Sequence, residues 1–301
     1  MMDKVVVITG PTAIGKTDIS LEIARHFQTE IINADASQFR KGLNIGTAKI
    51  DLENIDVVHH LIDIIEIEEP FSIKEYQTLA RMKISELISK GKLPLLVGGS
   101  GLYINSVIYN YELNDEGRDI SKEDESYNSF SNEELYNLLK ELDYEASIKI
   151  HPNNRRRVIR AIERAKMGSK ISEFTNGNKP YYDSLVIELV APRDVLYERI
   201  NQRFRKMLDL GWLDEVKSLK EKNIDLNKIK DIGYKELGLY LDGYISLAEA
   251  ESEITKQTRN YAKRQLTWFR NKMHTTKVNM DYSNLENTKI EIINLINDFL
   301  K

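Results

Sequence analysis

Short apolar runs alternate with longer amphipathic segments along most of the chain. The apolar runs are rich in β-branched residues and predict buried strands at 5–9, 30–33, 57–62, 93–97 and 184–190. Apolar residues at helical spacing predict helices between them, for example at 18–27 and 73–90. This alternation predicts an α/β fold in which a parallel sheet is flanked by helices.

The composition changes between residues 112 and 183. Asn, Asp, Glu, Ser and Lys dominate at first, and a pair of helices is predicted at 133–142 and 154–166. Ser131 and Glu134 have the spacing of a capping box at the start of the first of these helices. We therefore predict the first part of an α/β core over 1–111, an all-helical insertion over 112–183, and the rest of the core with C-terminal helices over 184–301.

The last part of the chain is predicted to be mostly helical. Helical spacing predicts a helix at 196–210, and Ser246 with Glu249 has the spacing of a capping box that begins a long helix ending near residue 270. Tyr261, Trp268 and Phe269 share one stripe of that helix. Such a stripe favours core packing over a surface that stacks on bases. The last twenty or so residues predict a closing helix.

The composition excludes several classes of protein. Of 301 residues, 41% are hydrophobic and 30% are charged, which is typical of a globular protein. The absence of cysteine excludes disulfides and thiolate metal sites, and five scattered histidines make a zinc site unexpected. No apolar run is long enough to span a membrane, and the chain begins directly with a predicted strand, so we expect no signal peptide and a cytoplasmic location. The net charge of −4 argues mildly against nucleic acid, although basic residues can still gather on one face.

One glycine-rich segment joins the first predicted strand to the first predicted helix and fits the P-loop pattern G-x-x-x-x-G-K-[ST]. Backbone N–H groups of such a loop and the helix N-terminus attract an anion. Lys16 adds a full charge, and the Thr17 hydroxyl is placed to reach Mg²⁺. A plain glycine turn is the alternative. The pattern predicts binding of a diphosphate or triphosphate. Its residues are Gly10, Pro11, Thr12, Ala13, Ile14, Gly15, Lys16 and Thr17.

Two further side chains follow predicted strands on the ligand side of the sheet. Asp35 ends the second strand, and we expect it to face the same crevice as the P-loop. A turn or N-cap aspartate is the alternative. The strand at 93–97 ends in two glycines, where many P-loop ATPases have an acidic Mg²⁺ ligand, and this argues against simple ATP hydrolysis. Ser100 follows those glycines and would point into the crevice, although a plain strand-to-helix turn has a similar sequence.

The second helix of the insertion has a basic face. Val158, Ile162 and Ala165 form an apolar stripe on a helical wheel. Four arginines fall on the opposite face: Arg156, Arg157, Arg160 and Arg164. This face suits phosphate groups, and a merely solvated face is the alternative.

Taken together, several stretches resemble one family, the tRNA dimethylallyltransferases, which are the tRNA isopentenyltransferases of bacteria and organelles. The stretches occur in the family's order and cover nearly the whole chain: GPTAIGKT at 10–17, NADASQ at 33–38, GLNIGTAK at 42–49, HHLIDI at 59–64, GGSGLY at 98–103, IHPNNRRRVIRAIE at 150–163, IGYKEL at 232–237 and TRNYAKRQLTWFR at 258–270. The resemblance implies a P-loop NTPase-like core with an inserted helical domain that grips the tRNA anticodon arm. It also implies transfer of a dimethylallyl group from its diphosphate to the N6 amine of the adenosine 3′ of the anticodon.

The resemblance assigns roles to the residues of the crevice. The P-loop would hold the donor diphosphate with Mg²⁺ on Thr17, and Arg203, Lys235 and Arg259 are possible further clamps. Asp35 would be the general base, and the Ser100 hydroxyl would help to hold the target base or Asp35.

The resemblance also predicts the tRNA contacts. The matching residues are Asp35, Ala36, Ser37, Gln38, Ser100, Arg156, Arg157, Val158, Ile159 and Arg160. The partners expected are therefore tRNA and dimethylallyl diphosphate, with no membrane, and we expect the chain to act as a monomer.

Some positions depart from the family's usual residues. Ala36 replaces a serine, Arg40 a common tyrosine, Ile14 a serine and Ser100 a threonine. These changes keep the base, the lysine and the hydroxyl for Mg²⁺, but a divergent paralogue remains open. The alternatives are a P-loop kinase for a small molecule and an RNA-binding protein without catalysis. Use of ATP would identify the first, and failure to modify tRNA the second.

Overall fold

The structure is a computed structural model that describes residues 2–111, 126–168 and 179–301. The chain divides into two compact units. One unit combines Met1–Tyr109 with Pro180–Lys301, and the other is Asn110–Lys179. The predicted bounds of the insertion, 112 and 183, lie within a few residues of these limits.

The larger unit is built on a parallel sheet. Its described strands are β1 (Lys4–Thr9), β2 (Ile31–Asn33), β3 (His59–His60), β4 (Leu95–Val97), β5 (Asp183–Val190) and β6 (Thr276–Asn279). Their order across the sheet is β3-β2-β4-β1-β5-β6, and every pairing is parallel. The parallel α/β fold predicted from the sequence is confirmed. The pattern missed β6, in which Val278 is the one buried residue.

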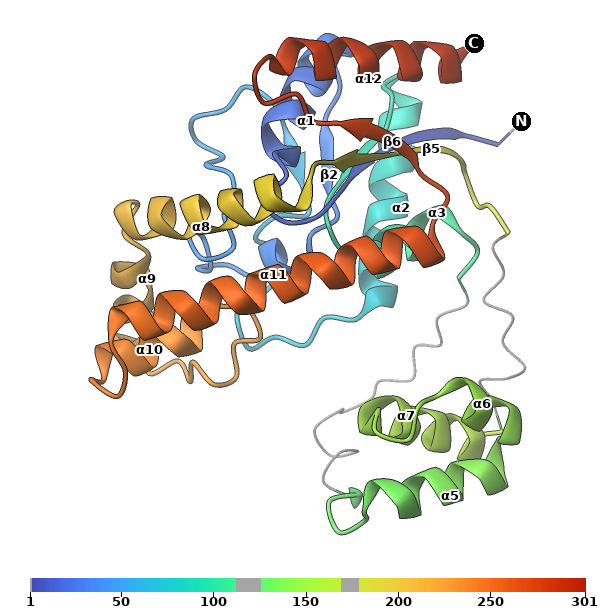
Figure 1. The fold of residues 1–301 in the computed structure, drawn as a ribbon. Coiled ribbons are helices and arrows are strands. Elements are labelled where there is room, and N and C mark those ends of the chain that lie inside the picture. Colours follow the sequence, from blue (N-terminus) through green and yellow to red (C-terminus); the bar gives the residue numbers. More distant parts are fainter. Residues whose placement is uncertain (1, 112–125, 169–178) are drawn as a thin grey trace. The chain divides into compact units, whose positions relative to one another are not determined.

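Helices pack on both faces of this sheet (Figure 1). On one face, α1 (Lys16–His26) packs beside α12 (Leu285–Leu300). On the other, α2 (Ile73–Ser89) packs against α3 (Gly101–Ile108). One hydrophobic cluster includes Val6, Ile8 and Leu95 of the sheet with Ile292 and Ile296 of α12. These side chains are almost fully removed from water, which is the main source of stability for such a layered fold.

A helical layer with its own hydrophobic cluster follows β5 in the chain. It consists of α8 (Arg193–Asp209), α9 (Trp212–Glu221), α10 (Tyr234–Leu241) and α11 (Leu247–Lys272). The buried rings of Phe204, Trp212 and Tyr234 form part of this cluster. The predicted capping box of α11 is confirmed, because Ser246 Oγ accepts from the Glu249 N–H and the Glu249 carboxylate accepts from the Ser246 N–H.

The smaller unit contains α5 (Asn132–Leu142), α6 (Tyr144–Lys149) and α7 (Arg155–Lys166). The predicted capping box of α5, formed by Ser131 and Glu134, is confirmed. Leu135 and Leu139 of α5 pack against Val158 and other buried residues of α7. This unit therefore has a hydrophobic core of its own.

None of the helices in the described ranges is long and apolar enough to cross a membrane.

Candidate active site

The P-loop leaves the C-terminal end of β1 and leads into α1. Gly10 and Gly15 have φ angles of 149° and 102°, in the left-handed range that favours glycine. Gly15 is the N-cap of α1, so the loop and the helix N-terminus form one anion-binding turn. Lys16 Nζ folds back over the loop and donates to the carbonyl oxygens of Gly10 and Pro11, at 2.9 and 3.0 Å.

Two side chains from distant parts of the chain hold the outer side of the P-loop. Arg199 of α8 donates from Nε to the Ala13 carbonyl at 2.8 Å. The Tyr282 hydroxyl donates to the Ile14 carbonyl at 2.9 Å, and the Arg199 guanidinium lies 4.2 Å from the centre of the Tyr282 ring. Because both donors take backbone carbonyls, they fix the shape of the loop and leave its N–H groups to other partners.

Two half-buried cations, Lys16 and Arg203, interact with Asp35. Burial lowers the pKa of Lys16 to about 8, an effect that Asp35 opposes and Arg203 reinforces. Burial likewise lowers the pKa of the Arg203 guanidinium, again against the attraction of Asp35. Arg203 Nη2 reaches the Thr47 carbonyl at 3.5 Å. Two partly desolvated positive charges beside one carboxylate make this end of the site favourable for a further anion.

Asp35 is held at the end of β2 by its neighbours. Its carboxylate accepts from the Ser37 N–H at 3.2 Å and thereby caps the short 3₁₀ helix η1 (Ala36–Phe39). The Asn33 side chain accepts from the Asp35 N–H at 3.0 Å and donates to the Leu61 carbonyl at 2.9 Å. The N-cap role considered as an alternative is therefore real, and it orients the carboxylate beside the two cations.

Ser100 links the turn after β4 to the turn after β2. Its hydroxyl accepts from the Ala36 N–H at 3.1 Å, and its own N–H donates to the Ala34 carbonyl at 3.2 Å. The Ser100 side chain also opposes the rise that burial causes in the pKa of the Tyr261 hydroxyl of α11. Ser100 thus contacts the backbone on either side of Asp35. Its predicted role in holding the target base or Asp35 stays a prediction.

Asp35, Arg203 and Tyr261 are among the residues that line a cavity of about 250 Å³, whereas Lys16 and Ser100 are not part of its lining. Thr12, Asp35, Ser37 and Arg203 form a polar part of its lining. The apolar part of the lining consists of Ile200, Phe204, Met207, Trp212, Ile232 and Ile254. A cavity of this composition can take a ligand that is charged at one end and hydrocarbon at the other.

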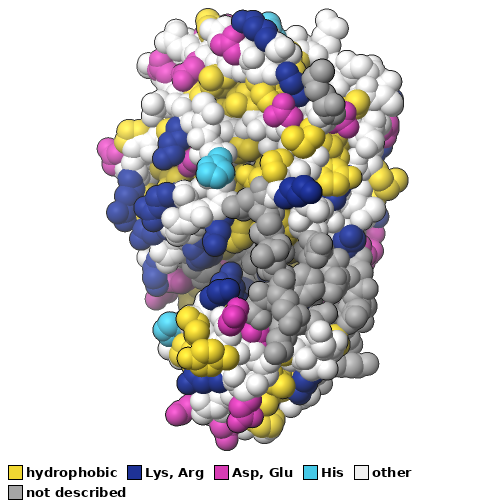
Figure 2. Space-filling model, turned by 90° about the vertical axis from the view of Figure 1, so that its right-hand side faces the viewer, with side chains coloured by type: hydrophobic (Ala, Val, Ile, Leu, Met, Phe, Trp, Pro, Cys, Tyr) yellow, Lys and Arg dark blue, Asp and Glu magenta, His cyan; other side chains and the backbone are white. Residues whose placement is uncertain are grey.

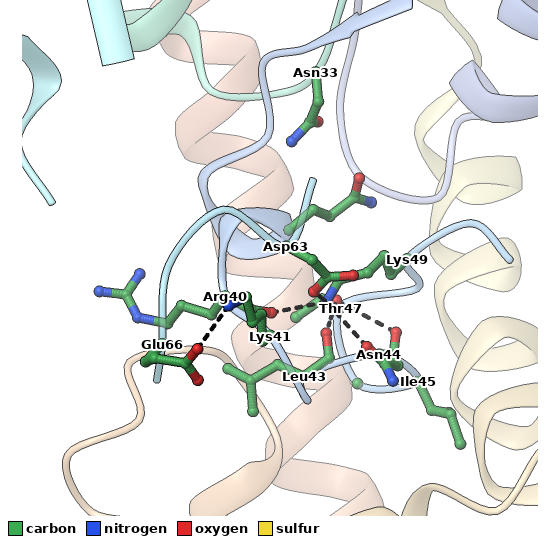
Figure 3. Close-up of polar contacts among 12 residues, drawn as sticks. Asn33, Arg40, Lys41, Leu43, Asn44, Ile45, Thr47, Lys49, Asp63 and Glu66 are labelled. Carbon is green, nitrogen blue, oxygen red and sulfur yellow. Dashed lines mark hydrogen bonds and ion pairs between the residues drawn. The ribbon is translucent and has the colours of Figure 1, made fainter. Parts of the chain in front are cut away.

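One wall of the cavity is the loop at 42–49, which contributes Gly46 and Thr47. Lys49 is 3% exposed and pairs with Asp63, and its Nζ also donates to Asn44 Oδ1 at 3.0 Å (Figure 3). Farther along the chain, the Glu215 carboxylate of α9 accepts from the N–H groups of residues 44, 45 and 46. This wall is therefore built by charged groups that are remote from it in sequence.

The structure does not bring two of the predicted diphosphate clamps to the cavity. Lys235 is exposed on α10, in a turn whose buried side belongs to Tyr234. Arg259 bonds the Thr255 side chain and carbonyl on its own helix and lies over the Tyr197 ring, 5.7 Å from the ring centre. Neither side chain is part of the lining, because the helical phase of α10 and α11 directs them elsewhere. Arg203 is the predicted clamp that lines it.

Two predicted tRNA contacts are core residues of the smaller unit. Val158 and Ile159 are 0% and 3% exposed and pack in the hydrophobic cluster of that unit. Their side chains therefore cannot contact RNA. Arg156, Arg157 and Arg160 are exposed on α7, as the helical wheel predicted. Figure 2 shows several Lys and Arg side chains next to one another on the face drawn, while the exposure of the three α7 arginines comes from the pattern of buried and exposed residues along that helix.

Several site residues were missed by the sequence analysis. Lys230, Asp231 and Arg264 line the cavity, and Arg199 supports the P-loop. The sequence feature that could have identified Arg199 as a site residue is its position one turn before Arg203 on the same helix. Asp231 comes directly before the IGYKEL stretch, but nothing in a single sequence placed its loop opposite Asp35.

Known proteins resemble this chain over most of its length. The family model of IPP transferase matches residues 38–272. A tRNA dimethylallyltransferase of Bacillus pumilus is 47% identical over 285 residues, which cover 92% of this chain and 89% of that protein. The protein of the same description from Bacillus subtilis is 46% identical over 284 residues, covering 92% and 90%.

Solved structures agree with this result. The full-length tRNA isopentenylpyrophosphate transferase of Bacillus halodurans has a TM-score of 0.75 at 42% identity and covers 99% of this chain and 97% of its own. A eukaryotic dimethylallyltransferase acting on tRNA has a TM-score of 0.87 at 28% identity, covering 99% and 79%.

The parallel sheet, the glycine loop after β1 and the inserted helices define a P-loop-type α/β protein. The comparisons then make the assignment specific. The chain belongs to the IPP transferase family. The resemblance drawn from the sequence is thereby confirmed, and so is the prediction that the protein is a prenyl-transferring enzyme.

Proposed function

We propose that this protein transfers the dimethylallyl group of dimethylallyl diphosphate to the N6 amine of the adenosine 3′ of the anticodon in tRNA, releasing diphosphate. The observation that carries the proposal is the cavity. It brings Thr12 of the P-loop, the half-buried Arg203 and the Asp35 carboxylate together with an apolar wall. The relatives named above are described as tRNA dimethylallyltransferases, which supports the same reaction.

The charged diphosphate end and the hydrocarbon end of the donor bind to different parts of the site. Its diphosphate lies against the P-loop, where Lys16 and Arg203 neutralise the charge that develops as the leaving group departs. Its hydrocarbon lies along the apolar wall that includes Phe204, Met207 and Trp212. This orientation points the reactive carbon toward the Asp35 side of the cavity.

Mg²⁺ fits the donor site as a partner of the diphosphate. The described residues contain no group of three or more acidic or histidine side chains that could hold a metal ion by themselves. Mg²⁺ commonly binds through substrate phosphates, water and only one or two protein oxygens. The exposed Thr17 hydroxyl at the start of α1 would supply the protein oxygen. When bound, the ion would add positive charge at the diphosphate.

Transfer forms a bond between the amine nitrogen and the first carbon of the allyl group, and the bond from that carbon to the diphosphate oxygen breaks. The amine must then lose a proton, which Asp35 accepts as general base. Ser100 and the Ser37 N–H position the segment that carries this carboxylate. Asp35 thus removes the proton of the acceptor amine at the place where the amine meets the donor.

Binding of tRNA would use the exposed arginines of α7. Phosphate contacts from Arg156, Arg157 and Arg160 provide affinity without reading sequence. The target adenine must also leave the stack of the anticodon loop to reach the cavity, which costs a few kcal/mol.

The decisive experiment combines the purified protein with labelled dimethylallyl diphosphate, Mg²⁺ and unmodified tRNA. We expect label in tRNA, released diphosphate, and no consumption of ATP when ATP replaces the donor. Consumption of ATP with phosphorylation of a small molecule would instead identify a kinase. Tight tRNA binding without any transfer would identify a non-catalytic RNA-binding protein.

A further inference from the structure

Gln265 joins the two loops that meet at the active site. It lies on α11, is 5% exposed, and belongs to the C-terminal stretch that no role in the reaction has yet explained. Its Oε1 accepts from the Thr12 N–H of the P-loop at 2.9 Å. Its Nε2 donates to the Gly99 carbonyl, in the turn after β4, also at 2.9 Å.

The chemistry of this bridge suits glutamine. One loop offers a backbone donor and the other a backbone acceptor, so the bridging side chain must accept on one side and donate on the other. A carboxylate lacks the donor, and an apolar chain of equal length lacks both groups. The space is also specific, since a Cβ at Gly99 would lie 2.3 Å from Gln265 Nε2. Close packing therefore leaves the amide little freedom to move.

Each bridged loop carries a different half of the proposed reaction. The P-loop carries the donor diphosphate. The turn at Gly99 continues into Ser100, whose hydroxyl accepts a hydrogen bond from the N–H of Ala36, the residue after Asp35. A bridge between these loops fixes the separation between the leaving group and the general base.

We propose that Gln265 is a positioning residue that sets the distance between the donor site and the acceptor site. The inference rests on the proposed function, because it gives the two loops their roles. A displacement of about 1 Å in a reacting group can lower a rate by roughly a hundredfold. Loss of the bridge should therefore reduce the transfer step more than it weakens binding of either substrate.

The test uses two variants of similar size and a matched control. Gln265→Met removes both hydrogen bonds, and Gln265→Glu keeps the acceptor but loses the donor. Gln257→Met is the control, because Gln257 is a half-buried glutamine on the same helix whose amide bonds Glu236 and Glu253 outside the cavity. Single-turnover transfer is measured at saturating tRNA and dimethylallyl diphosphate, with donor Kd determined separately. The amplitude of the turnover reports the folded, active fraction, and its rate reports positioning.

At about pH 8, where a carboxylate is fully charged, we expect both Gln265 variants to transfer roughly ten- to a hundredfold more slowly than the unaltered protein. The donor Kd should change by less than the rate does, and the control should keep the full rate. The carboxyl group introduced by Gln265→Glu can donate a hydrogen bond only when it is protonated. The rate of Gln265→Glu relative to Gln265→Met should therefore rise as the pH falls to about 5, toward the pKa of a glutamate. Effects of pH on the rest of the active site are common to both variants and cancel in this ratio.

The proposal would be overturned if the Gln265 variants transferred within about twofold of the rate of the unaltered protein, which is well short of the expected loss. It would also be overturned if saturating donor restored the rate, or if the rate of Gln265→Glu relative to Gln265→Met did not change with pH. A fall in amplitude at an unchanged rate would show a purely structural role and would also overturn it. Failure of the unaltered protein to modify tRNA is a separate outcome, which would remove the proposed function itself.

Discussion

Asp35 has the clearest single role among the residues of the site. It ends β2, its carboxylate is oriented by the Ser37 N–H, and both Lys16 and Arg203 lie within electrostatic reach. The carboxylate and the two cations are therefore gathered at the end of the sheet that carries the P-loop. A base held in this way needs little rearrangement when the amine attacks.

The first prediction is that Asp35→Asn slows transfer without unfolding the protein. Asparagine keeps the side-chain oxygen that caps η1 but cannot accept the amine proton. Positioned general bases contribute roughly a hundred- to ten-thousandfold, so the single-turnover rate should fall by about that factor. Binding of tRNA in a gel shift should change far less. A rate loss below about tenfold would exclude Asp35 as the base, because it lies under that range.

The second prediction concerns Asp231, which shares the cavity with Asp35. Burial raises the pKa of the Asp231 carboxyl, against the effect of its hydrogen bond with the Ser37 side chain, and Asp35 adds to the rise. A folded-state pKa above the unfolded one means that stability is present at low pH and lost as pH rises through the folded value. At neutral pH the charged Asp231 therefore lowers the free energy of unfolding.

Asp231→Asn should consequently raise the melting temperature at about pH 7, and the gain should shrink as pH falls to about 4, near the pKa of an unperturbed aspartate. Asp225→Asn is the control, since Asp225 is exposed in the preceding turn. Thermal unfolding followed by circular dichroism at several pH values provides the comparison. An Asp231→Asn protein that melts at a lower temperature than the unaltered protein at neutral pH would contradict this account.

The residues that the sequence identified are those set by local chain geometry. A P-loop after a buried strand and an acid at a strand end need only the position of the strand. Lys16 interacts with Asp35, and Ser100 bonds the residue after Asp35. The catalytic roles of these three residues stay predictions. Lys235 and Arg259 do not line the cavity, and a motif alone does not state which side of its helix faces a cavity. The bridging role of Gln265 could not be predicted from the sequence, because both of its partners are backbone groups more than a hundred residues away.

At the scale of elements, helix caps and runs of β-branched residues predicted helices and strands well. The capping boxes at Ser131 and Ser246 were predicted from spacing alone and are present. β6 was missed, because its sequence TKVN has one buried position and depends on β5 for pairing. The loop at 42–49 could not be predicted, since Asp63 and Glu215 hold it from outside the segment.

The third prediction tests α7 as a phosphate-binding element. Replacing Arg156 and Arg160 by alanine should weaken tRNA binding and reduce the slope of log affinity against log salt by about one to two, because up to two phosphate contacts are lost. Fluorescence anisotropy at several salt concentrations measures the slope. The matched control replaces Lys140 and Lys149, which are exposed on α5 and α6.

The control removes the same charge from the same unit. If it lowers the slope as much as the arginine pair does, the effect is one of overall charge and α7 has no special role. An unchanged slope in the arginine variant would mean that this face of α7 is only solvated.

At the scale of the whole molecule, the chain builds two units with separate cores. The larger one is discontinuous, since β5 returns after the insertion to pair with β1. The smaller one buries its own cluster of residues from α5, α6 and α7. A boundary of this kind was visible in the sequence as a change of composition, whereas the strand order depends on pairings that a single sequence does not specify.

The last prediction uses this division. The proposed donor site lies entirely in the larger unit, so dimethylallyl diphosphate with Mg²⁺ should stabilise that unit by mass action, by about 2.7 kcal/mol at a hundred times its Kd. Hydrogen exchange measured by mass spectrometry should then slow in the P-loop, α1 and α8, while α5 and α7 exchange as before. Addition of tRNA should slow exchange in α7 as well. In Lys16→Ala the effect of the donor should be lost and the effect of tRNA on α7 kept. Protection of α7 by the donor alone, or an unchanged P-loop, would contradict the assignment of donor binding to the larger unit and of tRNA binding to the arginines of the smaller one.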